Sequence, residues 1–99
     1  MYVTIAVSQK DIDWALQEIR DQQPVRGWDL PLINAVRRVL GLQREDVVIE
    51  DDEFLVSNWG AYPKMVGKIP KKAQDAARNF KHTGAMMYFT FRLDLKILS

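Results

Sequence analysis

The chain has 99 residues, of which 47% are hydrophobic, and its 14 basic and 13 acidic side chains leave a formal net charge of +1. This length and apolar content are typical of one compact domain, so we expect a single domain over residues 1–99. The chain has no cysteine, which excludes disulfides and thiolate metal sites and favours an intracellular location. No apolar run approaches the ~20 residues that span a bilayer, and the first residues lack the pattern of an export signal, so we expect no membrane partner.

The charges are unevenly distributed along the chain. Residues 45–53 contain six acidic side chains and no base, so this stretch is locally acidic. Residues 64–82 contain six lysines and arginines and one acid, Asp75, so a positive potential is expected there. This basic stretch is therefore the first candidate for a surface that binds an anion.

The N-terminal residues predict a strand followed by a helix. Residues 2–7 are β-branched and aromatic, a composition that suits a half-buried strand. Ser8 and Asp11 stand three residues apart and can satisfy free amides at a helix start, which predicts a helix from there to about Gln22. The apolar positions of this helix are Ile12, Leu16 and Ile19.

A second helix is predicted over residues 30–40. Asp29 is suited to its N-cap, and Pro31 falls in the first turn, where the missing amide is not needed. Gly41 can adopt the left-handed conformation that ends a helix. The residues expected to form one buried stripe are Leu32, Ala35, Val36, Val39 and Leu40.

Two short strands and an irregular segment should follow. Residues 47–49 and 54–57 are β-prone and separated by acids, which predicts a hairpin with its turn near Asp51 and Asp52. Residues 58–67 mix aromatic side chains with glycine and proline, so we expect no regular element there.

A third helix and a long strand complete the prediction. Pro70 can open the helix and Gly84 can end it, with a buried face formed by Ile69, Ala73, Ala76, Ala77 and Phe80. Apolar and polar residues then alternate over residues 87–97, which predicts one strand with a buried face. The order β-α-α-β-β-α-β indicates an α+β fold with a small antiparallel or mixed sheet packed by about three helices. The buried residues of the last strand should be Met87, Phe89, Phe91, Leu93, Leu95 and Ile97.

Three phrases of the sequence carry a family resemblance. They are VTIAVSQ at residues 3–9 followed by Ile12 and Asp13, the helix phrase PLINAVRR at residues 31–38, and Ile69–Pro70 with the closing FTFRL at residues 89–93. In these phrases the chain resembles short bacteriophage and prophage proteins with no established function. The resemblance implies a phage origin and a location in the cytoplasm of the host cell. Leu30 stands where these proteins often have a cysteine, so no cysteine chemistry is implied.

The sequence lacks the residue patterns that catalysis would require. The only histidine, His82, falls in the last turn of the predicted third helix, where positive charge is favourable. The acidic stretch lacks the glycine and the terminal glutamate of a calcium loop, and Gly60 and Gly67 fit no phosphate-binding spacing. We therefore expect no enzyme activity, no catalytic residue, no metal ion and no cofactor.

The basic stretch combines cations with aromatic rings. Its first lysines surround the start of the third helix, where free amides and the dipole favour an anion. Rings beside cations suit nucleotide bases and phosphates. The alternative interpretation is a solvated helix face with rings that fill the core. The candidate ligand-binding residues are Trp59, Tyr62, Lys64, Lys68, Lys71 and Lys72, with Arg37 and Arg38 of the second helix in second rank.

These features favour a phage counter-defence protein that acts by binding. In one form, a homo-oligomer sequesters a host immune-signalling nucleotide of the cyclic or ADP-ribose type. In the other form, the domain docks on a host defence protein through its acidic hairpin or aromatic loop, as small inhibitors of the anti-CRISPR type do. A nucleic-acid-binding module and a small enzyme acting on nucleotides are further alternatives, although a net charge of +1 gives the former little support.

Overall fold

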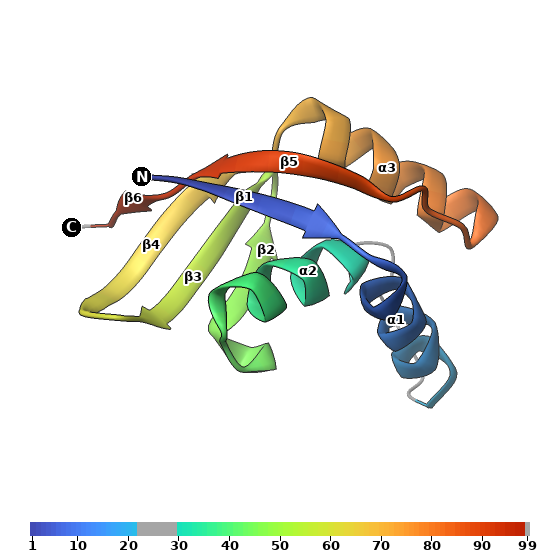
Figure 1. The fold of residues 1–99 in the computed structure, drawn as a ribbon, viewed down its shortest axis with the longest axis horizontal. Coiled ribbons are helices and arrows are strands. Elements are labelled where there is room, and N and C mark those ends of the chain that lie inside the picture. The colour runs from blue at the N-terminus through green and yellow to red at the C-terminus, as the bar shows by residue number, and fades with distance from the viewer. Residues whose placement is uncertain (22–29, 99) are drawn as a thin grey trace.

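The computed structural model describes residues 1–21 and 30–98 and confirms the predicted α+β class. Two helices follow the first strand, a third helix lies between the fourth and fifth strands, and a short 3₁₀ helix, η1, precedes the second strand (Figure 1). The elements are β1 (Tyr2–Val7), α1 (Gln9–Asp21), α2 (Leu30–Leu40), η1 (Arg44–Asp46), β2 (Val47–Glu50), β3 (Glu53–Trp59), β4 (Tyr62–Lys68), α3 (Lys71–Thr83), β5 (Phe89–Asp94) and β6 (Lys96–Ile97).

The described strands form two antiparallel sheets. One sheet has the order β1-β5, and the other has the order β2-β3-β4-β6. The chain changes sheets at Leu95, whose amide donates a hydrogen bond to the carbonyl oxygen of Met1 at 2.8 Å. The prediction of one uninterrupted strand over residues 87–97 was therefore wrong, because β5 pairs with β1 whereas β6 pairs with β4.

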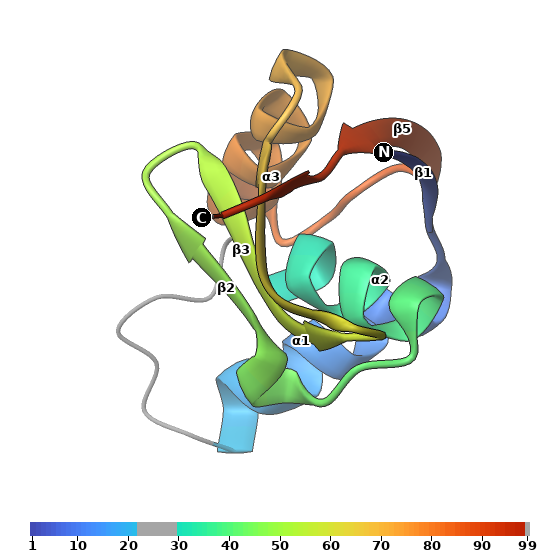
Figure 2. The ribbon, with the colours of Figure 1, turned by 90° about the vertical axis from the view of Figure 1, so that its left-hand side faces the viewer.

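Helix α2 lies between the two sheets. It contacts both β1 and β2, and Figure 2 shows β2 and β3 on the opposite side of α2 from β1. All seven residues from Leu30 to Val36 are buried, so this part of the helix is covered on every side. The single predicted stripe was too narrow, and Val39, which it included, is 38% exposed. A helix that is apolar all round is typical of the interior of a fold.

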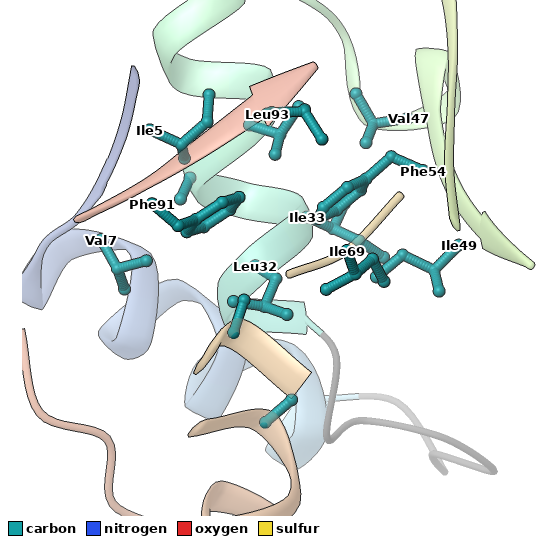
Figure 3. Close-up of a cluster of buried hydrophobic side chains, with 14 of the residues drawn as sticks. Ile5, Val7, Leu32, Ile33, Val47, Ile49, Phe54, Ile69, Phe91 and Leu93 are labelled. Atoms are coloured by element: carbon teal, nitrogen blue, oxygen red, sulfur yellow. The ribbon is translucent and has the colours of Figure 1, made fainter. Parts of the chain in front are cut away.

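Two phenylalanine rings join the sheets within the core. Phe54 on β3 and Phe91 on β5 are stacked, with ring centroids 6.3 Å apart and ring planes 5° apart. The close-up in Figure 3 places Leu32 and Ile33 of α2 beside these rings. Both sheets and α2 therefore contribute to one core, whose other labelled members are Ile5, Val7, Val47, Ile49, Ile69 and Leu93.

The segment predicted to be irregular forms most of a β-hairpin. Strand β3 continues to Trp59, the chain turns at Gly60, which has a φ of 62°, and β4 begins at Tyr62. Pro63 lies opposite Asn58, between the pairs Trp59–Tyr62 and Ser57–Lys64, and this is the position in the hairpin at which no pair forms. The prediction failed because Gly60 and Pro63 were taken to interrupt regular structure, whereas Gly60 forms the turn between two adjacent strands and Pro63 lies within β4.

Several local predictions were correct. The hairpin turns at Asp51, whose φ of 54° is left-handed, and α3 follows Pro70 and ends at Gly84, which has a φ of 73°. Strand alternation holds in the middle of β5, but Met87 is 84% exposed and Ile97 is 56% exposed, whereas both were predicted to be buried. The predicted helix end at Gln22, the N-cap at Asp29 and the side chain of Ile19 lie outside the described residues.

An ion pair between buried Asp11 and partly exposed Arg38 connects the start of α1 to the end of α2. Asp11 is fully buried, and its carboxylate accepts hydrogen bonds from the Ser8 amide at 2.9 Å and the Ser8 hydroxyl at 3.1 Å. Arg38 donates to the same carboxylate through Nε and Nη2, each at 3.0 Å. Its Nη2 also donates to the carbonyl oxygen of Ala6 at 2.6 Å. The hydrogen bond to Asp11 raises the pKa of Arg38 above its usual value, so the guanidinium stays charged.

Replacing Arg38 should therefore be costly. We expect Arg38→Met to lower the free energy of unfolding by about 3 kcal/mol, because it leaves the Asp11 carboxylate buried without its counter-charge. The matched control is Arg44→Met, which removes a more exposed ion pair with Glu18 and should cost at most about 1 kcal/mol. Urea unfolding measures both values. Equal losses in the two variants would contradict the structural role of the Asp11–Arg38 pair.

Gly67 allows β4 and β5 to approach closely. A Cβ atom at this position would lie 2.8 Å from Cδ1 of Leu93 and 3.1 Å from the carbonyl oxygen of Asp94. We expect Gly67→Ala to lower the free energy of unfolding by about 2 kcal/mol through this crowding. Gly60→Ala is the control, because it meets open space and suffers only the strain of positive φ, about 1 kcal/mol. If thermal or urea unfolding shows the smaller loss at Gly67, close approach does not limit this position.

Candidate functional site

The two aromatic side chains predicted to bind a ligand lie at one end of the β3–β4 hairpin. Trp59 and Tyr62 are cross-strand partners beside the turn. Both rings are partly buried and pack against the hydrophobic core. Much of their surface is therefore used for packing within the fold.

The predicted lysines are spread along β4 and into α3. Lys64 and Lys68 are exposed on β4, and Nζ of Lys68 lies 3.6 Å from a carboxylate oxygen of Asp52. Lys71 and Lys72 are exposed in the first turn of α3, with Nζ of Lys72 5.8 Å from the centroid of the Phe89 ring. Because a strand rises about 3.3 Å per residue, β4 separates Tyr62 from the helix start by roughly 20 Å. The structure does not bring the rings and the helix-start lysines around one hollow.

The two second-rank arginines have separate environments. Arg38 forms the ion pair with buried Asp11, whereas the guanidinium carbon of Arg37 lies 4.8 Å from the ring centroid of Trp14. Nζ of Lys10 lies 4.9 Å from the same ring, which is 36% exposed. The combination of cations and an aromatic ring expected at Trp59 therefore occurs at Trp14. The four-residue spacing of Lys10 and Trp14 on α1 was a signal that could have indicated it.

A hollow of about 260 Å³ lies beside α3, and we call it the α3 hollow. One wall is a single face of α3 that contains Gln74, Ala77, Arg78 and Lys81, residues separated by three or four positions. Nε2 of Gln74 donates a hydrogen bond to the carbonyl oxygen of Ile69 at 2.8 Å, which holds this side chain at the rim. The remaining lining residues are Leu32, Asp51 and Ile69.

The α3 hollow has positive charges on one side and a negative charge on the other. Arg78 and Lys81 are contributed by α3, whereas Asp51 comes from the turn between β2 and β3. Arg78 pairs with Asp75 at 3.4 Å, but both side chains are more than half exposed, so this pair is weak and can exchange for another anion. Arg78 and Lys81 belong to the basic stretch but were not among the predicted ligand-binding residues. Their helical spacing from Ala77 and Gln74 was a signal that could have indicated them.

Two further classes of site, a metal centre and a membrane-spanning helix, are absent from the described part of the chain. Residues 1–21 and 30–98 contain no group of three or more side chains suited to hold a metal ion. Within the same ranges, no helix is both long and apolar enough to cross a bilayer. No protein-family model, curated protein sequence or solved structure matches the chain.

The packing of Trp59 can be tested by its effect on stability. We expect Trp59→Ala to lower the free energy of unfolding by about 2 kcal/mol, because the ring covers part of the core. Trp14→Ala should cost about 1 kcal/mol, since it removes an exposed ring and its cation contacts. Urea unfolding of both variants provides the comparison. A larger loss for Trp14 would show that Trp59 is not the structural ring.

Proposed function

We propose that the chain is a phage-encoded counter-defence protein that captures a nucleotide without turning it over, and that the ligand occupies the α3 hollow. The observation that carries this proposal is the juxtaposition of Arg78 and Lys81 with apolar walls in one open hollow. Guanidinium and ammonium groups are the side chains that bind phosphate most strongly. The phage origin is supported by the sequence phrases at residues 3–9, 31–38 and 89–93.

The lining residues suit the separate parts of a nucleotide. Arg78 and Lys81 would neutralise the phosphate through charge-assisted hydrogen bonds. Asp51, on the other side of the hollow, would accept hydrogen bonds from ribose hydroxyls or a base amino group. The apolar walls formed by Leu32 and Ile69 would pack against the base. Such a lining holds and orients a ligand, which favours sequestration as the mode of action.

The volume of the hollow narrows the class of ligand. Pockets that enclose drug-sized molecules usually measure about 300–1,000 Å³. At about 260 Å³, the α3 hollow matches a mononucleotide or the phosphate end of a larger nucleotide. A cyclic dinucleotide or ADP-ribose would extend beyond it into solvent.

Calorimetric titration with 5′-AMP, 5′-GMP, a cyclic dinucleotide and ADP-ribose tests the proposal. We expect at least one of these nucleotides to bind. The double variant Arg78→Gln/Lys81→Gln should weaken that binding at least tenfold, which corresponds to about 1.4 kcal/mol. The matched control is Lys71→Gln/Lys72→Gln, which removes two positive charges from the same helix outside the hollow and should change affinity less than about twofold.

Three results would overturn separate parts of the proposal. Absence of binding by every nucleotide would exclude nucleotide capture. An equal loss of affinity in the control variant would show that the ligand does not occupy the α3 hollow. Chromatographic detection of a product after incubation of the bound nucleotide would replace sequestration with catalysis.

A further inference from the structure

The solvent-facing side of the four-stranded sheet carries an apolar row. Side chains on the inner side, such as Val47, Phe54 and Met65, are buried, so the alternate residues face outward. The pairing register aligns Val48 with Leu55, and Leu55 with Val66. Directly paired residues of an antiparallel sheet share a face, so these three side chains form a row across β2, β3 and β4. We call this side the outer sheet face.

Charged residues on the outer sheet face are divided by sign. Glu50 on β2 and Glu53 on β3 are paired with each other, so both carboxylates lie on one half of the face. Lys64 and Lys68 on β4 and Lys96 on β6 lie on the other half. The face therefore has an acidic half and a basic half, and the apolar row runs from one to the other.

Nothing in the described part of the chain covers this face. Val48 is 44% exposed, and Leu98, whose amide donates to the carbonyl oxygen of Lys64 at 3.1 Å, is 49% exposed. These two residues line a shallow groove of about 180 Å³ together with Leu55. Within residues 1–21 and 30–98, no ion pair engages Glu50, Glu53, Lys64 or Lys96. The described residues thus leave Val48 and Leu98 exposed and Leu55 and Val66 half-buried, with most of the neighbouring charges unpaired.

We propose that the outer sheet face binds the same face of a second copy of this chain. A two-fold axis that lies between the faces and runs parallel to the strands places the acidic half of each copy over the basic half of the other. In this arrangement β3 lies over β4 of the second copy, so Glu53 faces Lys68 and Leu55 faces Val66. A two-fold axis perpendicular to the strands would instead stack acids on acids. Charge complementarity therefore selects the first axis, which also gives the aligned packing that sheets favour.

The size of the face predicts a weak dimer. Four strands about 4.8 Å apart and about five residues long present roughly 300–350 Å² of flat area in each copy. Both copies together bury roughly 700 Å², which is below the ~1,200 Å² at which stable interfaces begin. We therefore expect a dissociation constant in the micromolar range.

The proposed dimer is independent of nucleotide capture. The outer sheet face and the α3 hollow share no lining residue, since the hollow is formed by α3, Leu32, Asp51 and Ile69. Either proposal can therefore fail without the other.

Sedimentation velocity from about 10 µM to about 500 µM tests the dimer. The sedimentation coefficient should rise with concentration towards that of a dimer, and this rise should be smaller when the salt concentration increases from about 50 mM to about 500 mM.

Charge-swapped variants test which surface forms the dimer. Glu50→Lys/Glu53→Lys makes the outer sheet face largely basic, and Lys64→Glu/Lys68→Glu makes it largely acidic. Each variant should be monomeric alone, and the two should form a heterodimer when mixed. Lys71→Glu/Lys72→Glu, away from the face, should dimerise like the unaltered chain.

A variant without a charge change provides a second test in case the charge-swapped chains do not fold. Leu55→Ser removes the centre of the apolar row from an exposed side of the sheet and should weaken dimerisation at least tenfold while circular dichroism stays unchanged. A chain that remains monomeric at every concentration would overturn the proposal and leave the face to a different protein. Dimerisation that survives both Leu55→Ser and the charge swaps would show that another surface is used.

Discussion

The burial of α2 between two small sheets is the constraint on which the rest of the structure depends. A two-stranded sheet has too little apolar surface to be stable in water by itself. Helix α2 supplies apolar side chains to both sheets, which explains why every residue from Leu30 to Val36 is buried. The stacked rings of Phe54 and Phe91 complete the connection, because each ring comes from a different sheet. The Asp11–Arg38 pair then fixes the end of this helix against α1 and β1.

This arrangement determines which surfaces remain available for binding. Helix α2 lies on the inner side of the four-stranded sheet, and the described residues leave the apolar row on the opposite side exposed at Val48 and half-buried at Leu55 and Val66. Helix α3 follows β4 and presents the face of Gln74, Arg78 and Lys81 next to the turn at Asp51, which creates the α3 hollow. The two proposed binding surfaces thus lie on different parts of the molecule and share no lining residue. A dimer formed through the sheet would carry two α3 hollows, which is consistent with a protein that removes a small ligand from solution.

The candidate site was only partly predictable. The basic stretch from residue 64 to residue 82 was correctly identified as rich in positive charge, and both cations of the α3 hollow come from it. The individual residues predicted to bind the ligand do not meet in one pocket, since Trp59 and Lys71 are separated by the full length of β4. Proximity in sequence suggested a common pocket, but an extended strand carries its two ends far apart. The approach of Arg37 to Trp14 likewise depends on contact between two helices.

The sequence by itself determined the features that arise within one element. Gly84 ends α3 because it adopts positive φ readily, and the alternation around Phe91 and Leu93 defines the buried side of β5 through the geometry of a single strand. Only the tertiary structure decided that the last strand divides at Leu95 and that α2 is covered on every side. Those outcomes depend on hydrogen bonds and apolar contacts between segments far apart in the chain. No local pattern of residues specifies which distant partner a segment will meet.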